Sequence, residues 1–232
     1  MNAKMVQQVA KSTMEYLETQ ITPQISVKEI VRLAEMYMKN AGIAAFWYYD
    51  IGAFVFAGED TTQSISGRNY VPSSRIIGEN DIITIDLSPQ YGGTWGDYAR
   101  TIIVENGQIK KTAAQIETPE FRDGILAEEQ LHQKLIEIAT PNMTFDELYH
   151  LMNDSIRQLG YVNLDFNGNL GHSIETSKDD RIYIEQNNNT KLSAVEYFTF
   201  EPHIKKASSD YGFKMENIYC FRNSRLVDIL RT

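Results

Sequence analysis

The stretch Asp81-Ile-Ile-Thr-Ile-Asp-Leu-Ser88 alternates apolar and polar side chains and is rich in β-branched residues. Such a run predicts a β-strand. A second stretch, Thr94-Trp-Gly-Asp-Tyr-Ala-Arg-Thr101, follows after Gln90-Tyr-Gly-Gly93, which is a turn signal. The two stretches together predict an antiparallel hairpin.

This hairpin brings two aspartates to one face. A tight turn centred on Tyr91 and Gly92 places Asp86 directly opposite Asp97, with Cβ atoms roughly 5 Å apart. Ile83 and the other apolar residues of the first strand then point the other way, into a core. Two carboxylates this close repel each other unless one is protonated or a cation lies between them. The alternative is a slipped register that leaves one aspartate in solvent.

The composition is that of a soluble globular protein. The 232 residues are 42% hydrophobic and 23% charged, which suits one domain or two fused halves. The formal charge of −9, without a basic stripe, argues against nucleic-acid binding. No apolar run reaches the length of about 18 residues that a membrane span needs. Cys220 is the only cysteine, so we expect no disulfides and no thiolate metal site, and a cytoplasmic location.

Helices and strands alternate along the chain. Capping signals and apolar spacing predict four helices, over residues 3–19, 26–40, from 118 onward, and 144–160. Strands are expected over 46–58, as one long strand or a pair, and over 181–185, 197–200 and 213–221. Strands gathered in the middle and at the end, with the helices set apart, predict an α+β fold with an antiparallel sheet.

Three further residues have the chemistry of metal ligands or catalytic groups. His172 directly follows a glycine, Glu201 ends an apolar strand, and Glu216 lies within a strand whose neighbours are apolar. Taken singly, each also fits an ordinary role, as a loop histidine or a solvated residue on a strand face. A glutamate among apolar neighbours is costly unless it is paired or coordinated.

Asp86, Asp97, His172, Glu201 and Glu216 together form a candidate metal-ligand set. Four carboxylates carry a charge that two divalent cations neutralise. Oxygen ligands with one imidazole suit manganese, cobalt, iron or zinc (Mn, Co, Fe or Zn) rather than a thiophilic metal. Two such ions about 3.5–4 Å apart can activate a water and polarise a carbonyl.

In order and context, these residues resemble the ligand motifs of the methionine aminopeptidase and Xaa-Pro peptidase superfamily. The matching segments are residues 81–88, Gly96-Asp-Tyr-Ala-Arg-Thr, Gly171-His-Ser-Ile, Phe200-Glu-Pro and Phe213-Lys-Met-Glu-Asn. The resemblance covers most of the chain. It implies a single catalytic domain over residues 1–232 with the pita-bread fold, in which helices flank a curved antiparallel sheet.

The resemblance also implies a role for each residue. Asp97 and Glu216 would bridge both ions, Asp86 would hold one ion, and His172 and Glu201 would hold the other. Glu201 would in addition manage the proton of the nucleophilic water. The implied function is a dinuclear metal-dependent hydrolase, an aminopeptidase or Xaa-Pro-type peptidase that cleaves short peptides with a metal-bridged water.

The chain departs from the family pattern at two histidines that contact the substrate and stabilise the reaction intermediate. Val71-Pro-Ser-Ser74 stands where a Pro-His loop is expected, and Asp179 stands seven residues after His172. Loss of one such donor typically costs about 10²–10³ in rate. His203, two residues beyond Glu201, is the candidate catalytic replacement, because strand alternation places both on one face.

Two residues are candidates for contact with the substrate. Lys214 lies two residues before Glu216, where Xaa-Pro peptidases usually carry an arginine, and lysine lacks the bidentate guanidinium fork. Asp179 would directly bind a substrate that bears a positive group. Either feature would change which peptide is accepted.

Three functions fit these observations. The five ligands favour the dinuclear hydrolase, whereas the missing histidines favour a catalytically weak or inactive pita-bread protein that binds a peptide or a partner. A non-peptide amidase on the same scaffold fits both the five ligands and the missing histidines. The expected partner is a small peptide, with no nucleic acid and no membrane, and either a monomer or a homodimer is consistent with the sequence.

Overall fold

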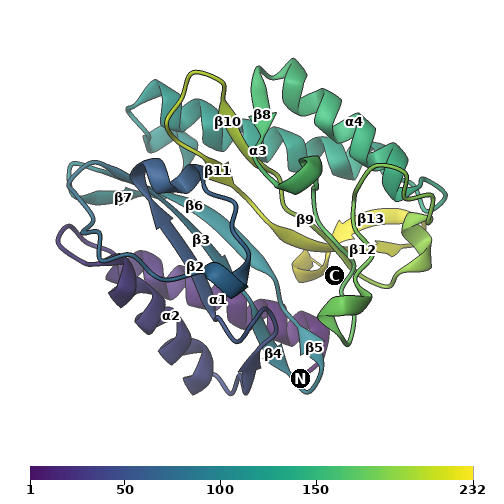
Figure 1. The fold of residues 1–232 in the computed structure, drawn as a ribbon, viewed down its shortest axis with the longest axis horizontal. Helices are drawn as coiled ribbons and strands as arrows, with labels where there is room; N and C mark the ends of the chain where they lie inside the picture. Colours follow the sequence, from purple (N-terminus) through teal and green to yellow (C-terminus); the bar gives the residue numbers. More distant parts are fainter. Residues whose placement is uncertain (232) are drawn as a thin grey trace.

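In a computed structural model that describes residues 1–231, helices lie on both outer sides of antiparallel sheets (Figure 1). The four helices are α1 (Ala3–Gln20), α2 (Val27–Asn40), α3 (Pro119–Ile138) and α4 (Phe145–Gln158). In Figure 1, α1 and α2 lie together below the sheets, and α3 and α4 lie above them. The arrangement confirms the predicted α+β class with antiparallel strands.

The strands form four small antiparallel sheets. The largest has the order β2-β3-β6-β7 and contains β2 (Ala53–Ala57), β3 (Asp81–Leu87), β6 (Tyr98–Glu105) and β7 (Gln108–Lys110). The sheet β1-β4-β5 contains β1 (Ala45–Phe46), β4 (Pro89–Tyr91) and β5 (Thr94–Trp95). The sheet β11-β10-β8 contains β8 (Tyr161–Asn163), β10 (His203–Lys206) and β11 (Phe213–Lys214). The sheet β13-β12-β9 contains β9 (Phe198–Phe200), β12 (Asn217–Arg222) and β13 (Arg225–Asp228).

The register of the central hairpin differs by two residues from the prediction. Asp86 on β3 pairs with Ala99 on β6, not with Asp97. The cause is the turn, which centres on Gly92 and Gly93, with φ values of +58° and +80° that glycine adopts without strain. Because side chains alternate with a period of two, a shift of two residues leaves the two aspartates on the same face as diagonal neighbours.

Two predicted strands differ in the structure, whereas residues 46–58 hold the pair of strands that was one of the two predicted alternatives. Residues 46–58 hold two strands in different sheets, because the chain bends at Tyr49 and Asp50, which both have positive φ. Residues 181–185 form no regular strand, only a bridge between Tyr183 and His172. Residues 213–221 are divided into β11 and β12 at Glu216, whose backbone N–H donates to a carbonyl of β6.

The predicted helix starts are present, although one capping box is incomplete. The Ser26 hydroxyl accepts from the Glu29 N–H at 3.2 Å, but the Glu29 carboxylate bonds Arg32 instead of returning to the cap. Thr144 and Glu147 form both halves of the second box. None of the helices in the described part of the chain has both the length and the apolar character that a membrane crossing requires.

Two hydrophobic clusters stabilise the two halves of the chain. In the first, α1 and α2 pack on the inner face of β3, where Ile83, Ile85 and Leu87 are fully buried as predicted. In the second, α3 and α4 pack on the C-terminal strands, and Ile82 of β3 belongs to this cluster. Strand β3 is therefore covered on both faces, and Asp86 lies on the same face as Ile82.

Strand β6 joins the two halves. The Thr101 hydroxyl accepts from the Lys214 N–H at 2.8 Å and lies 3.0 Å from the Lys214 carbonyl, to which it donates. The Glu216 N–H donates to the Ala99 carbonyl at 2.9 Å. These bonds hold the segment around Glu216 against the hairpin that carries the two aspartates.

His132 on α3 lies in the second cluster, with Nδ1 2.7 Å from the Tyr219 hydroxyl and Nε2 3.0 Å from the Met215 carbonyl. Burial lowers the pKa of His132 to about 3, whereas the pKa in an unfolded chain is about 6.5. The folded protein therefore binds a proton at His132 more weakly than the unfolded chain does. The resulting stability is present above about pH 6.5 and is lost as the pH falls toward 3.

We predict that His132→Gln flattens the acid limb of the stability profile. In the parent protein, this histidine lowers the free energy of unfolding by up to about 1.4 kcal/mol per pH unit as the pH falls below about 6.5. Denaturant melts of parent and variant between pH 7 and pH 4 measure the difference. His150→Gln is the control, because His150 is exposed on α4. Parallel profiles for parent and His132→Gln would contradict the prediction.

Candidate metal centre

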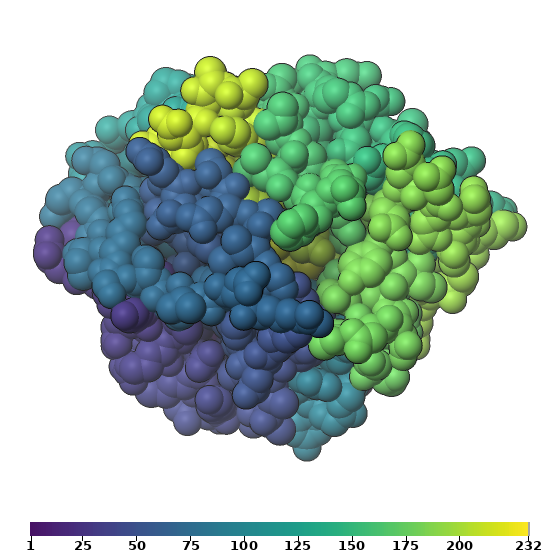
Figure 2. All heavy atoms as spheres, viewed as in Figure 1, coloured from purple at the N-terminus to yellow at the C-terminus, as the bar shows by residue number. Residues whose placement is uncertain are grey.

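A cavity of about 360 Å³ opens between the two halves of the chain. Figure 2 shows the hollow near the centre of one face, between N-terminal segments in blue and C-terminal segments in green. Asp86, Asp97, His172 and Glu201 line this cavity. Glu216 is fully buried and adjoins the two aspartates. The structure thus brings the five predicted ligands together.

The first group of donors comes from the hairpin and the segment that packs on it. Ligand atoms of Asp86, Asp97 and Glu216 lie within 4.8 Å of one another. Asp97 lies between β5 and β6, and Gln7 of α1 holds its backbone on both sides. The Gln7 Oε1 accepts from the Asp97 N–H at 2.8 Å, and Nε2 donates to the Asp97 carbonyl at 2.6 Å.

The break between β11 and β12 places Glu216. Its N–H donates to the Ala99 carbonyl, and its carbonyl accepts from Arg100 Nη1 at 2.8 Å. The Nη2 atom of Arg100 donates to Asn217 Oδ1 at 2.7 Å. Strand β6 thus holds this segment on both sides of the glutamate, and the side chain is fully buried beside the aspartates.

His172 begins the second group of donors. Gly171 before it has φ +136°, and a Cβ there would lie 2.4 Å from the Thr199 carbonyl oxygen, so the close backbone approach requires glycine. The His172 Nδ1–H donates to the Ser173 carbonyl at 2.9 Å, which leaves Nε2 unprotonated. Nε2 lies 3.5 Å from Asp97 Oδ2 and 3.8 Å from Glu201 Oε1.

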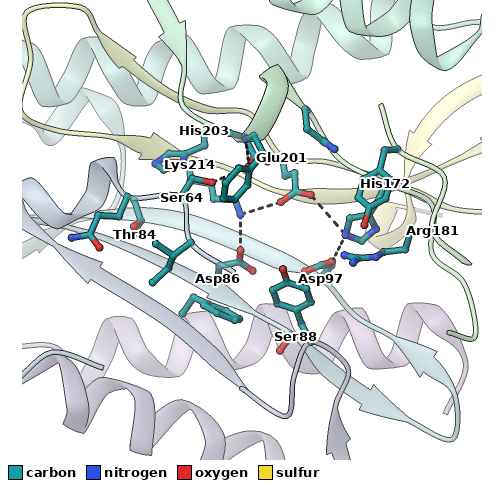
Figure 3. Close-up of a pocket in the computed structure, with 18 of the residues that line it drawn as sticks. Ser64, Thr84, Asp86, Ser88, Asp97, His172, Arg181, Glu201, His203 and Lys214 are labelled. Carbon is teal, nitrogen blue, oxygen red and sulfur yellow. Dashed lines mark hydrogen bonds and ion pairs between the residues drawn. The ribbon is translucent and has the colours of Figure 1, made fainter. Parts of the chain in front are cut away.

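Lys214 connects the two groups. Its Nζ lies 2.6 Å from Asp86 Oδ2 and 3.0 Å from Glu201 Oε2, as the dashed lines in Figure 3 show. The sequence suggested that Lys214 contacts the substrate. The ammonium group lines the cavity but is bonded to two predicted metal ligands, because the short strand β11 aims it at them.

Burial and mutual repulsion both act on the carboxylates. Burial, with the charges of neighbouring acids, raises the pKa of Asp97 and of Glu216 well above their usual values. Burial also raises the pKa of Glu201. Burial alone would lower the pKa of Lys214, but the surrounding carboxylates outweigh it and raise that pKa. These raised pKa values follow from the confinement of four carboxyl groups with a single ammonium group.

The donor atoms fit divalent cations. Among the described residues, Asp97 Oδ2 and both carboxylate oxygens of Glu216 are buried without a hydrogen-bond partner. Buried polar atoms are rarely left in this state, because desolvation is then uncompensated. The unprotonated Nε2 of His172 adds a nitrogen donor. An oxygen-rich set with one imidazole suits Mn, Co, Fe or Zn.

Two other predicted site residues lie differently from expectation. His203 lines the cavity, but the strand breaks at Pro202, and the Nε2–H of His203 donates to the Thr61 carbonyl at 2.7 Å. Asp179 does not line the cavity. Its side chain is 79% exposed and pairs with Lys178, because a short 3₁₀ turn directs it to solvent. The expected contact of Asp179 with the substrate is therefore not supported.

Sequence reasoning missed two residues of the site. Gln7 is a buried glutamine on a helix face that is mostly apolar, and its polarity at such a position was the available signal. Arg181 lines the cavity, two residues after Asp179. Neither a motif nor a capping pattern distinguishes this arginine from a surface residue, so the sequence carried no signal for it.

An α+β fold that encloses buried carboxylates and one imidazole between its halves is the architecture of the pita-bread metallopeptidases. The chain belongs to Metallopeptidase family M24, whose sequence profile matches residues 2–223. Solved structures confirm the fold. The X-Pro aminopeptidase from Thermotoga maritima has a TM-score of 0.81 at 18% identity, over 99% of this chain and 60% of that one. The methionine aminopeptidase from the same organism has a TM-score of 0.75 at 14% identity, over 99% and 95%.

Curated relatives come from both branches of the family. The Xaa-Pro dipeptidase of Pyrococcus furiosus is 31% identical over 149 residues, which are 62% of this chain and 40% of that protein. Methionine aminopeptidase 1 of Bacillus subtilis is 34% identical over 95 residues, which are 40% of this chain and 37% of that protein. The matches therefore span less than half the length of these relatives.

We predict that Asp97→Asn lowers the amount of bound divalent metal. The substitution keeps the shape of the side chain but removes a charge shared by both donor groups. Elemental analysis after dialysis against Mn²⁺ measures metal per chain in the parent and the variant. Asp179→Asn is the matched control, because that carboxylate is exposed outside the cavity. Equal metal content in the Asp97→Asn variant and the parent would rule out the assigned centre.

We also predict that a chelator lowers the melting temperature more at pH 7 than near pH 4. A ligand that binds only the folded state stabilises it by RT ln(1 + [L]/Kd). The pKa values of Asp97, Glu201 and Glu216 are raised in the folded protein, so folding favours the protonated carboxyl groups. Without metal, these three groups therefore stabilise the folded state at low pH, and this stabilisation is lost as the pH rises through their folded pKa values.

Thermal melts with Mn²⁺ and with EDTA at both pH values measure this difference. Comparing Mn²⁺-loaded with chelated protein at the same pH cancels the contributions that titrating groups remote from the centre make to the melting temperature. A chelator effect of equal size at pH 4 and pH 7 would contradict the prediction.

Proposed function

We propose that the protein is a dinuclear metal-dependent hydrolase, of the aminopeptidase or Xaa-Pro peptidase type, that acts on short peptides. One observation carries the proposal: two donor groups share Asp97. Asp86 and Glu216 complete the first group, and His172 and Glu201 complete the second. Membership of a metallopeptidase family, with relatives named as Xaa-Pro dipeptidase and methionine aminopeptidase, supports it.

Two bound divalent ions, with manganese or cobalt suited to this donor set, would activate a water and polarise the scissile carbonyl. Glu201 is the residue of the chain that takes up and releases the proton of the nucleophilic water. This carboxyl group faces the cavity, and its side chain is 13% exposed. Burial favours its neutral form, while Lys214 on Oε2 favours the ionised form. A carboxyl group under these opposed influences can take a proton and return it to the leaving amine.

His203 has a narrower role than that of an intermediate-stabilising donor. Burial lowers the pKa of His203 to about 4, so the ring is neutral at pH 7. Its one ring proton, on Nε2, is already donated to the Thr61 carbonyl. Nδ1 is then an acceptor, which suits a bond from a substrate N–H rather than to a developing oxyanion.

The cavity walls limit the substrate to short chains. A volume of about 360 Å³ is at the small end for organic-ligand sites, which run from about 300 to 1,000 Å³. Aromatic side chains form much of the wall, among them Trp47, Tyr48, Phe54 and Tyr183. Such walls exclude water from the reacting groups and strengthen the electrostatic interactions there.

A second candidate is a protein of this fold that binds a peptide without cleaving it. The engaged proton of His203 favours this function, because the ring cannot replace the two absent imidazoles. Metal binding alone does not separate the two functions, so turnover is the deciding measurement.

We predict that Mn²⁺-loaded protein hydrolyses unblocked di- and tripeptides and that Glu201→Gln lowers kcat by about 10²–10⁴-fold, the usual contribution of a general base. Amine release is followed by chromatography, and metal content is measured on the same samples. Glu175→Gln is the control, because Glu175 lies three residues from His172 and does not line the cavity. No turnover by fully loaded parent protein would favour the binding protein over the hydrolase.

A further inference from the structure

A second cavity, of about 320 Å³, is lined by residues of α1 and α3. Strand β6 and the segment that follows β7 supply further parts of its wall. Lys214 is the residue that this cavity shares with the first one, and Met215 beside it lines the second cavity as well. The second cavity therefore adjoins the segment that carries Glu216, but the five predicted metal ligands do not line it.

Glu128 of α3 supplies a buried carboxyl group to the wall of the second cavity. The residue is 2% exposed, and among the described residues neither of its carboxylate oxygens has a hydrogen-bond partner. Burial raises the pKa of Glu128 well above its usual value, and the positive charges of Lys214 and Arg100 oppose this shift only in part. Buried polar atoms are rarely left without partners, because their desolvation is then uncompensated. The two oxygens can accept hydrogen bonds from a ligand in the cavity.

The lysines that line the second cavity are paired with acids other than Glu128. The pairs are Lys11 with Glu15, Lys110 with Glu117, Lys111 with Glu18, and Lys214 with Asp86 and Glu201. The remaining cation of the wall is Arg100.

Arg100 makes its hydrogen bonds to neutral groups. Its terminal nitrogens donate to the carbonyls of Ala99 and Glu216 and to Asn217 Oδ1. The guanidinium carbon also lies 3.8 Å from the ring centre of Tyr98. A guanidinium group has five N–H donors, so these three bonds leave two donors for a further acceptor. The cavity thus contains an arginine that can bind a carboxylate and an acid that can bind an ammonium group.

Apolar side chains complete the wall, among them Met14, Ile102, Ile116 and Ile125. The volume of about 320 Å³ is at the small end for organic-ligand sites, which run from about 300 to 1,000 Å³. A single small molecule with an ammonium group, a carboxylate and an apolar part matches these three kinds of wall. A zwitterion also brings no net charge into the cavity, which limits the cost of desolvation.

We propose that the second cavity binds a free α-amino acid with an apolar side chain, such as leucine. The ammonium group of the ligand donates to Glu128, its carboxylate accepts from Arg100, and its side chain packs against the apolar wall. The inference does not depend on the proposed hydrolase, because the site lies outside the metal-ligand centre.

Three ligands that share one apolar side chain test the proposal by calorimetry with the Mn²⁺-loaded full chain. Leucine carries both charges, 3-methylbutylamine lacks the carboxylate, and 4-methylpentanoate lacks the ammonium group. The parent protein should bind leucine about tenfold tighter or more than either analogue, as expected for charge-assisted hydrogen bonds. Glu128→Gln should weaken leucine and the amine by about tenfold or more without weakening 4-methylpentanoate.

Glu137→Gln is the matched control, because Glu137 also belongs to α3 but is exposed and does not line the cavity. We expect this variant to bind all three ligands as the parent does. A second measurement decides the question even if Glu128→Gln fails to fold. Nuclear Overhauser effects between the methyl groups of leucine and those of Met14 and Ile125 in the parent protein should place the ligand in the second cavity.

Four results would overturn the proposal: no binding of leucine, equal affinity of the parent for leucine and either analogue, equal leucine affinity in the parent and Glu128→Gln, and no contact of bound leucine with Met14 or Ile125. Equal leucine affinity in the parent and Glu128→Gln would place the amino acid elsewhere, for example in the first cavity. None of these results bears on turnover of peptides, so the proposed hydrolase stands or falls separately.

Discussion

The structure depends on confining the carboxylates of Asp86, Asp97, Glu201 and Glu216 in one buried centre with a single lysine. Like charges at these separations repel strongly where water is excluded. Lys214 is paired with two of the four, and burial drives Asp97 and Glu216 toward their neutral forms. The rest of the fold has to keep the acids together against their repulsion.

The scaffold does this with backbone hydrogen bonds rather than with contacts among the acids. Gln7 clamps the backbone of Asp97, although the two are 90 residues apart in the sequence. Ala99 and Arg100 hold the backbone of Glu216 on both sides. Among the described residues, Asp97 Oδ2 and both carboxylate oxygens of Glu216 are thereby left without a hydrogen-bond partner. A backbone held in this way positions a ligand without using the ligand's own donor atoms.

The cavity wall also presents His203 and Arg181. The Nε2–H of His203 donates to the Thr61 carbonyl within the chain. The Arg181 guanidinium group lies over the Trp47 ring, and its Nε–H donates to the Lys178 carbonyl. Because arginine stays protonated in proteins, Arg181 keeps a positive charge on this wall.

The sequence by itself determined the α+β class and the limits of three helices to within a few residues, because periodicity and caps are local, and its ordered motifs predicted the five candidate ligands. Only the tertiary structure decided that Asp86 pairs with Ala99, that the last strand breaks at Glu216, and that Arg181 faces the cavity while Asp179 faces solvent. These outcomes depend on turn geometry and on contacts between distant segments. Residues as close in sequence as Asp179 and Arg181 can therefore lie in solvent and in the cavity respectively, and no local sequence pattern predicts this difference.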